Sequence, residues 1–446
     1  MNSAGMRTAF LLLLLAIAVR PLAAEFRVGT AKADITPPIG SRMYGYGARG
    51  TNVSTGVHDP LFAKALVVSD GSVEVALVTL DLGSFGADNT RRVRALVRRE
   101  VDLDGVLLVA SHTHSAPVFD SSFPDPDAPW LNSMEEKAAR AVVEAHGRLQ
   151  LARLSVGWGR VEEGHNRRKV LPDGSVEMMW GNRERLPTNP VDYSVAVVAF
   201  DSPDGEPLAT LVNFACHPVV LGPENLEISA DYPGAMMAMV EETTGGQAMF
   251  IQGAAGDINP FWDKTPPSEG GFEQMERMGH ALGAEVIRIR NGLRSFSQPA
   301  SLSLRRETVL LEPRWDLEDP DVQEKFRTLG GEALLQRYRT RFADEREAEI
   351  DTLLVGNSLA LATFPGEFFV EHGLRLKQGS MIENTLFVGY GNGALAYFPT
   401  IRAAAEGGYG GREATLVEVG AGEKLVSRAL INLHYQAGKL RLVPDP

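Results

Sequence analysis

The chain has 446 residues, of which 44% are hydrophobic and 23% charged, and it contains 45 glycines, 26 prolines and a single cysteine. This composition is typical of a globular, loop-rich protein and excludes disordered and fibrous chains. A chain of this length can bury a core that needs no structural metal, and one cysteine excludes an intrachain disulfide. The formal net charge of −13 disfavours nucleic acid and anionic membrane surfaces, so we expect no nucleic-acid partner.

The N-terminal residues have the pattern of a targeting segment. Arg7 precedes an apolar run over residues 9–19, and small residues end at Ala24. We interpret residues 1–24 as a signal peptide whose removal leaves Glu25 as the first residue of a secreted or periplasmic protein. The alternative is an uncleaved anchor, although the run is short for a membrane-spanning helix. No later stretch reaches that length, so we expect no transmembrane segment after cleavage.

The rest of the chain alternates between apolar strand-like runs and helical patterns, which is typical of an α/β protein. We expect strands over residues 26–35, 61–69, 73–81, 106–110, 154–161, 176–180, 194–200, 208–215, 248–251 and 352–364. We expect helices over residues 91–100 and 133–146, one that begins at Asp231, and one whose apolar face covers residues 275–289. Asp-Gly pairs at 70–71 and 204–205 predict hairpins.

Two further features concern the organisation of the chain. The sequence Ser133-Met134-Glu135-Glu136 has the spacing of a capping box, which places a helix start there. Residues 313–350 are charged and helix-rich, and we interpret them as a surface excursion. Because no repeat or low-complexity linker divides the mature chain, we expect one catalytic domain over residues 25–446.

The most informative stretch joins a buried-strand pattern to a pair of histidines. His112 and His114 follow the apolar run over residues 106–110, and Pro117 ends the segment. In an extended segment, residues two apart point to the same side, so both imidazoles would reach one point. Polar residues at the carboxyl end of a strand are where α/β proteins commonly place their chemistry. The alternative is a pair of exposed loop histidines.

The same arrangement recurs later in the chain. The run over residues 208–215 is followed by Cys216-His217-Pro218, and the run over 352–364 is followed by Glu367. Tyr397 lies in a glycine-rich loop. Neutral imidazoles with a carboxylate suit Zn²⁺, which in catalytic sites keeps a position open for water. Since these residues are far apart in sequence, a zinc site and a purely structural core role for His217 both stay open on spacing alone.

Five short motifs carry a resemblance to a known family. They are Ala31–Pro37 (AKADITP), Ser111–Ser115 (SHTHS), Asn213–Pro218 (NFACHP), Gly256–Pro260 (GDINP) and Pro365–Phe368 (PGEF). In this order they resemble the neutral/alkaline (non-lysosomal) ceramidase family. The resemblance implies a zinc amidohydrolase that cleaves the N-acyl bond of a lipid such as ceramide. It also implies a layered α/β fold, with mixed β-sheets flanked by helices.

The resemblance assigns roles residue by residue. One zinc ion would be held by His112, His217, Glu367 and Tyr397. His114 would face the substrate, and Arg167 would lie near the scissile amide. Tyr409 is a weaker candidate for the pocket wall. Asp81 and Asp231 fit supporting or capping roles better than metal ligation, and Cys216 fits core packing.

The chain departs from the family in two respects. Asn259 stands where the family has a serine, and an amide side chain cannot act as a nucleophile. We therefore expect hydrolysis through zinc-bound hydroxide, with Arg167 and Asn259 donating to the developing charge and His114 transferring the proton. The sequence also ends soon after these motifs, so we expect the family's C-terminal β-sandwich domain to be missing.

Two functions are consistent with this pattern. The first is a secreted zinc hydrolase that cleaves the amide bond of a small-molecule or lipid N-acyl substrate. The second is a non-catalytic zinc-containing binding protein that kept the fold after losing the family serine. The complete set of zinc-ligand matches favours the hydrolase.

Overall fold

The computed structural model describes residues 25–119, 130–293, 300–342, 346–412 and 414–441. The signal peptide expected at residues 1–24 lies outside these ranges. Within them, no helix combines the length and the apolar character that crossing a membrane requires.

The fold is built on a mixed eight-stranded sheet in the order β13-β11-β10-β6-β1-β3-β4-β5. All neighbours are antiparallel except β11 with β13 and β4 with β5, which are parallel. The strands are β1 (Phe26–Asp34), β3 (Phe62–Ser69), β4 (Glu74–Leu80), β5 (Gly105–Ala110), β6 (Gln150–Arg160), β10 (Ser194–Asp201), β11 (Pro207–Phe214) and β13 (Gln247–Gln252).

A second sheet of four strands, β15-β16-β17-β19, packs against one face of the first. Its strands are β15 (Leu302–Leu311), β16 (Arg346–Val355), β17 (Leu359–Thr363) and β19 (Asn384–Val388). One apolar cluster contains inward side chains from both sheets, including Val28 and Leu77 from the large sheet and Leu361 and Leu386 from the small one. The two sheets therefore form the middle layers of the molecule.

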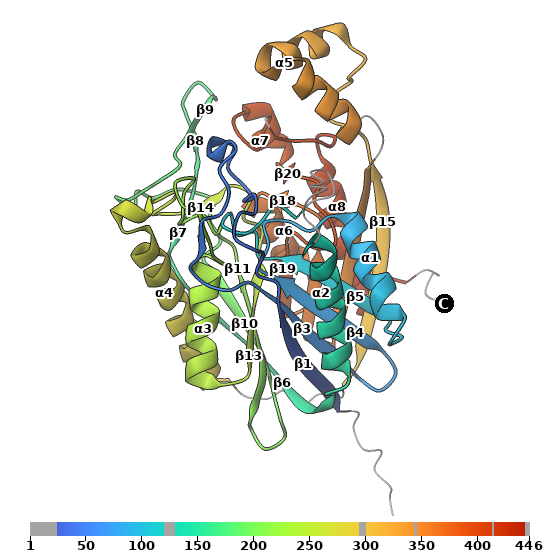
Figure 1. Ribbon diagram of the computed structural model, residues 1–446. Coiled ribbons are helices and arrows are strands. Elements are labelled where there is room, and N and C mark those ends of the chain that lie inside the picture. The colour runs from blue at the N-terminus through green and yellow to red at the C-terminus, as the bar shows by residue number, and fades with distance from the viewer. Residues whose placement is uncertain (1–24, 120–129, 294–299, 343–345, 413, 442–446) are drawn as a thin grey trace, which may run out of the picture.

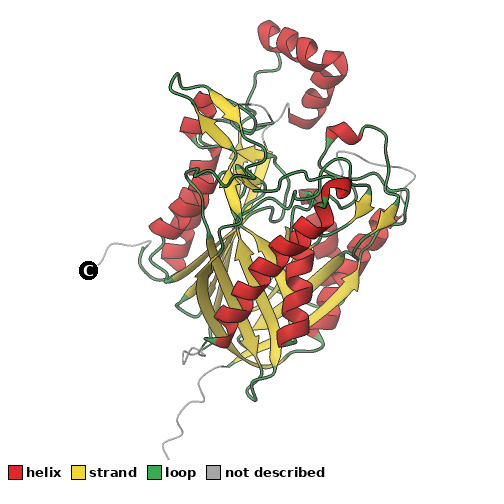
Figure 2. Cartoon of the chain, turned by 90° about the vertical axis from the view of Figure 1, so that its left-hand side faces the viewer, coloured by secondary structure: helices red, strands yellow, loops and turns green. Residues whose placement is uncertain are grey.

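Helices cover the outer face of each sheet, which gives four layers (Figures 1 and 2). The large sheet is covered by α1 (Ala87–Arg98), α2 (Trp130–His146), α3 (Tyr232–Thr244) and α4 (Gly271–Asn291). The small sheet is covered by α6 (Val370–Gly379) and α8 (Ala421–Gln436), with the short α7 (Ile401–Glu406) beyond them. Helix α5 (Pro320–Phe342) stands away from these layers (Figure 1).

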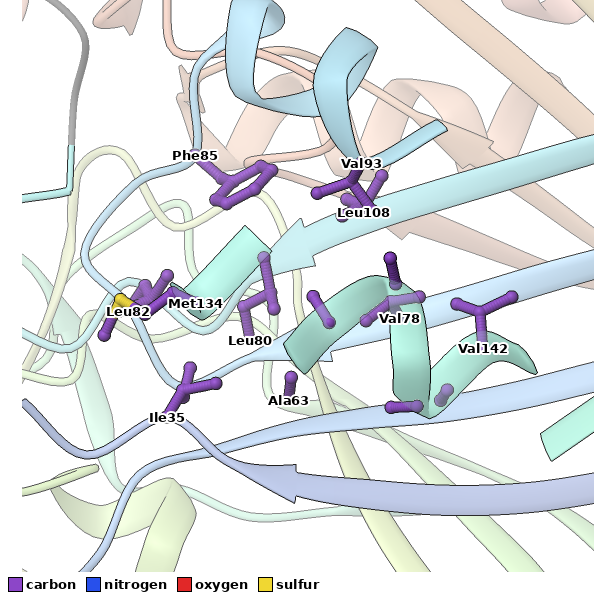
Figure 3. Close-up of a cluster of buried hydrophobic side chains, with 14 of the residues drawn as sticks. Ile35, Ala63, Val78, Leu80, Leu82, Phe85, Val93, Leu108, Met134 and Val142 are labelled. Carbon is purple, nitrogen blue, oxygen red and sulfur yellow. The ribbon is translucent and has the colours of Figure 1, made fainter. Parts of the chain in front are cut away.

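The uninterrupted apolar sequence of strand β5 follows from its position between two apolar clusters. Val106 and Leu108 pack under α1 and α2, as Figure 3 shows for Leu108 beside Val93. Leu107 and Val109, which point to the opposite face, pack against the small sheet. A strand that is buried on both faces needs apolar residues at every position rather than at alternate ones.

The two sheets meet at the carboxyl end of β5. The amide nitrogen of Ala110 donates to the carbonyl oxygen of Tyr390 at 3.2 Å, and that of Asn392 donates to Leu108 at 2.8 Å. The Asn392 side chain accepts from the amide of Leu108 at 2.9 Å. The loop after β19 is thus fastened to the end of β5, directly before His112.

Short elements surround this junction. They are β2 (Gly56–Val57) with β12 (Glu227–Ile228), β7 (Gly164–Asn166) with β14 (Ile258–Pro260), β8 (Arg168–Val170) with β9 (Val176–Met178), β18 (Glu367–Phe368) with β20 (Tyr397–Phe398), and the 3₁₀ turns η1 (Gly47–Arg49) and η2 (Pro267–Glu269). The pairs β7–β14 and β18–β20 carry residues that the sequence singled out.

The structure confirms the α/β class with layered mixed sheets flanked by helices, and both hairpins at the Asp-Gly pairs.

The single strand expected over 352–364 is wrong, because residues 356–358 turn and separate β16 from β17. Residues 346–350 belong to β16 and not to a surface excursion, and the edge strand β15 was not predicted. The described part of α2 begins at Trp130, so Ser133 lies inside the helix and does not cap it. The extent of one domain over 25–446 stays a prediction.

Candidate metal centre and active site

His112 leaves the end of β5 with its ring held in one orientation. Its main chain has a positive φ of 70°, which is uncommon for a residue other than glycine. Its amide donates to Leu82 at 2.9 Å, and its Nδ1 lies 2.6 Å from the carbonyl oxygen of Gly83. Because a carbonyl only accepts, Nδ1 must donate, which leaves the Nε2 lone pair free to bind a metal.

His217 has the same arrangement at the end of β11. Its amide donates to Ile258 at 2.9 Å, and its Nδ1 lies 2.6 Å from the carbonyl oxygen of Ala255. Both rings are 1% exposed. The two histidines therefore both present an Nε2 lone pair inside the protein, with 4.9 Å between their ring centroids.

The other donors lie close to these two nitrogens. Oε2 of Glu367 lies 3.2 Å from Nε2 of His217 and 3.4 Å from Nε2 of His112. Nε2 of His114 lies 3.2 Å from Nε2 of His112, and the three histidines offer nitrogens within 4.8 Å of one another. Donors around a tetrahedral zinc with bonds of about 2.0–2.1 Å lie roughly 3.3–3.4 Å apart. Lone pairs at these distances repel unless a cation lies between them, so the donor set fits a zinc ion.

The electrostatics favour the protonation states that bind metal. Burial raises the pKa of the Glu367 carboxyl, but His112 and His217 beside it outweigh burial and hold that pKa well below its usual range. Burial lowers the pKa of His217 to about 4. A carboxylate and a neutral imidazole are the forms in which these groups ligate zinc.

The geometry behind the His-x-His motif differs from the expected extended segment. His112 is in the left-handed region, and His114 begins a turn, yet their Nε2 atoms still meet. His114 is less buried than its two partners, and burial lowers its pKa well below the usual value. Its ring packs against Tyr46, with 4.9 Å between centroids. Gly45 touches the same ring so closely that a Cβ would lie 2.2 Å from Nδ1, and its φ is 98°.

Arg167 links the residues on the other side of the centre. Its guanidinium is buried and donates to Oδ1 of Asn259 at 3.1 Å, to the carbonyl oxygen of Gly256 at 2.7 Å and to the hydroxyl of Tyr397 at 3.1 Å. The β7–β14 ladder, which pairs His165 with Asn259, brings this segment alongside. The resemblance indicated a role for Arg167, but residue patterns did not predict β7 or its pairing, because its strand partner β14 lies some 90 residues away.

Tyr397 reaches the centre through the β18–β20 pair, in which it is the register partner of Glu367. Its hydroxyl accepts from Arg167, and its ring lies 5.3 Å from that of Tyr409. The structure thus gathers His112, His217 and Glu367 around one point and places Tyr397 beside Glu367. The roles of Tyr397 as ligand and of His114 as a proton carrier stay predictions.

Comparison with known proteins identifies the family. A family model described as "Neutral/alkaline non-lysosomal ceramidase, N-terminal" matches residues 26–264. This chain belongs to the neutral/alkaline non-lysosomal ceramidase family.

Individual relatives agree with this assignment. Neutral ceramidase from Pseudomonas aeruginosa is 24% identical over 386 residues, or 81% of this chain and 53% of the relative. Neutral ceramidase from Drosophila melanogaster is 35% identical over 102 residues, or 22% of this chain and 14% of the relative. The crystal structure of the Pseudomonas enzyme covers 95% of this chain with a TM-score of 0.74 at 21% identity, over 77% of its own chain. This chain therefore spans about half the length of the Pseudomonas relative, and the structural likeness shows the fold.

Asn259, where the resemblance of the motifs predicted a serine in relatives, is held by hydrogen bonds on both sides of its amide. Its Oδ1 accepts from Arg167, and its Nδ2 donates to Oδ2 of Asp263 at 3.0 Å. Lys264 donates to the same Oδ2 at 2.5 Å. Only one of the two Nδ2 protons can point at Asp263, so the buried amide keeps a second donor.

Sequence reasoning missed several residues of this ceramidase-family site. Tyr390 stacks on His112, with 4.1 Å between ring centroids. Arg49 is buried and donates to the carbonyl oxygens of Tyr44 and His114 at 2.6 and 2.7 Å, and more weakly to those of two further residues, which holds the His114 loop in place. Tyr390 lies in the same glycine-rich loop as Tyr397, but Arg49 carried no sequence signal, because its hydrogen bonds are all to main-chain oxygens.

Asp81 and Asp231, the aspartates predicted to have supporting or capping roles, are buried and make main-chain hydrogen bonds. Asp231 caps α3 by accepting from Tyr232 at 2.7 Å and also accepts from Leu221 at 3.1 Å. Asp81 accepts from the amide of Phe62 at 2.9 Å. Burial raises the pKa of Asp231 to about 7 and that of Asp81 to about 6.

The raised pKa of Asp81 predicts a pH-dependent cost. The folded protein binds more protons than the unfolded chain between about pH 4 and 6, so its stability falls as the pH rises through that range, by about 2–3 kcal/mol in total. Asp81→Asn does not titrate, so its free energy of unfolding relative to wild type should increase by that amount from pH 4 to 6 and then level off. Urea unfolding of both proteins from pH 4 to 7 measures this difference. A difference independent of pH contradicts the assignment.

Proposed function

We propose that this protein is a zinc-dependent amidohydrolase that cleaves an N-acyl bond of a small molecule or lipid. Membership of the ceramidase family supports this reaction class. The observation that carries the proposal is the position of the Glu367 carboxylate between two histidines whose Nδ1 atoms donate to main-chain oxygens. An ordinary structural histidine pair would not leave both Nε2 lone pairs directed at a carboxylate.

In this proposal, His112, His217 and Glu367 hold the ion, with Tyr397 as the fourth protein ligand. Bound zinc would supply a water of lowered pKa as the nucleophile and a positive charge for the substrate carbonyl. This chemistry requires no side-chain hydroxyl, so Asn259 in place of serine is compatible with turnover.

The protein's own groups account for the remaining steps. His114 is the least buried histidine of the three and is kept neutral by burial, so it can accept a proton and pass it to the leaving amine. Arg167 and the second amide proton of Asn259 can donate to the negative charge that develops on the carbonyl oxygen. Trp180, Tyr397 and Tyr409 surround the Arg167 guanidinium, which keeps it dry and oriented.

The alternative function is a zinc-containing binding protein without catalysis. Asn259 favours this alternative, because its amide oxygen and amide nitrogen both form hydrogen bonds, to Arg167 and to Asp263. These contacts give Asn259 a structural role that does not depend on catalysis.

Removing the histidine ligands should release the metal. We expect His112→Ala and His217→Ala each to lose zinc and amidase activity together, while the fold survives because the site lies at strand ends outside the core clusters. Elemental analysis and circular dichroism measure both properties. His146→Ala, at a partly exposed histidine paired with Glu74 at 3.0 Å, is the matched control and should keep its zinc. Full zinc occupancy in the His112→Ala/His217→Ala double variant would rule out this site.

Substitutions at Asn259 should separate the two functions. Asn259→Ala should lower turnover of an N-acyl substrate by on the order of 10²–10³, the usual cost of an oxyanion donor. Asn259→Ser should change the rate only modestly and form no acyl-enzyme, which mass spectrometry of quenched reactions tests. A zinc-loaded wild type that is inactive, with activity appearing only in Asn259→Ser, would instead establish the binding protein.

Export is part of the proposal and rests on the sequence of residues 1–24. We expect the purified native protein to begin at Glu25 and to occur outside the cytoplasm. N-terminal sequencing of protein from fractionated cells tests this, and intact Met1 on cytoplasmic protein would refute it.

A further inference from the structure

Lys264 occupies an unusual place at the outer end of the Arg167 network. Its main chain has a φ of 52°, a region that a lysine seldom adopts. Main-chain hydrogen bonds of 2.8 Å from Lys264 to Val219 and from Thr265 to Val220 hold this conformation. Strained backbone of this kind persists where the surroundings enforce it and is frequent at functional sites.

The side chain of Lys264 lies against a partly exposed aromatic surface. Its ammonium group is 4.4 Å from the ring centre of Trp180, and Arg167 contacts the same indole at 5.1 Å. The Lys264 side chain is 31% exposed and Trp180 is 38% exposed. Arg167, by contrast, is buried. Lys264 is thus the cation of this pair that an incoming molecule can reach.

The Lys264 ammonium has donors beyond its ion pair. Three N–H groups belong to it, and one of them donates to Oδ2 of Asp263, which also accepts from Asn259. Arg167 lies near two further carboxylates, those of Glu367 and Asp257. Nε of Arg167 is buried without a hydrogen-bond partner. Burial lowers the pKa of Lys264, and Asp263 opposes that shift. The remaining N–H groups of the partly exposed ammonium can donate to an acceptor on an incoming molecule, and a carboxylate is the acceptor that an ammonium binds most strongly.

We propose that Lys264 and Trp180 form a carboxylate-binding site beside the metal centre, so that the preferred substrates are N-acyl compounds with a carboxylate close to the scissile amide. N-acyl amino acids are the simplest members of this class. Lys264 connects through Asp263 and Asn259 to Arg167, and a substrate anion held there lies near the residue at the family's serine position. The inference rests on the proposed hydrolytic function.

The test compares two substrates that differ only in charge. Zinc-loaded protein is assayed for release of dodecanoate from N-dodecanoylglycine and from N-dodecanoylglycinamide. We expect wild type to favour the carboxylate by at least about tenfold in kcat/KM, the size of effect that a hydrogen bond to a charged group provides. Lys264→Met should bring this ratio to near one, mainly through KM, and Lys264→Arg should retain most of it.

Two controls exclude a merely structural role. Lys169→Met removes a lysine that is paired with Glu177 at 3.0 Å on the neighbouring β8–β9 hairpin, and it should leave the ratio unchanged. Zinc content of each variant shows that the site is intact. A wild type without carboxylate preference, or a Lys264→Met variant that keeps the preference while both rates fall together, would overturn the proposal.

If the protein is not a hydrolase, binding measurements can still test the carboxylate site. If wild type cleaves neither substrate, calorimetric titration with the same two compounds tests whether Lys264 binds a carboxylate. Binding that prefers N-dodecanoylglycine in wild type and loses that preference in Lys264→Met supports the carboxylate site in a binding protein. Equal binding of both compounds to wild type refutes it.

Discussion

The candidate centre depends on two hydrogen bonds from imidazole to main chain. His112 donates to Gly83 and His217 to Ala255, each at 2.6 Å. These contacts choose the tautomer and the ring orientation, and they direct both Nε2 lone pairs at Glu367. Because the acceptors are main-chain carbonyls at the ends of neighbouring segments, the position of each ring follows from the backbone path. A shift of either segment would move a donor away from the common point.

The layered architecture supplies that backbone path. Strands β5 and β11 lie toward opposite edges of the large sheet, yet the segments that follow them meet at the centre, where the amide of His114 donates to Pro218 at 3.4 Å. The loop after β19 is hydrogen-bonded to the end of β5. Gly256 shows how closely the segments approach one another, since a Cβ at this position would lie 2.5 Å from the carbonyl oxygen of Glu367. The site is therefore built where two sheets join, and its donors come from segments as far as 255 residues apart, from His112 to Glu367.

Two arginines without solvent access organise the surroundings of the metal centre. Arg49 binds the main chain of the His114 loop, and Arg167 joins Asn259, Gly256 and Tyr397. A planar guanidinium can hold several acceptors at once in a fixed geometry. Asn259 fits this network because its amide oxygen accepts from Arg167 and its amide nitrogen donates to Asp263.

Part of this protein could be predicted from the sequence alone. Local periodicity and Asp-Gly turns placed the strands of the large sheet and both hairpins, and short ordered motifs indicated the family and the histidines at the strand ends. The edge strand β15 was missed because half-solvated positions such as Arg305 and Arg306 interrupt its apolar pattern. The carbonyl acceptors of His112 and His217, the contacts of Arg49 and the meeting of Trp180 with Lys264 were decided only by the tertiary structure. Main-chain oxygens are chemically identical at every position, and contacts between distant segments exist only once the two sheets have packed.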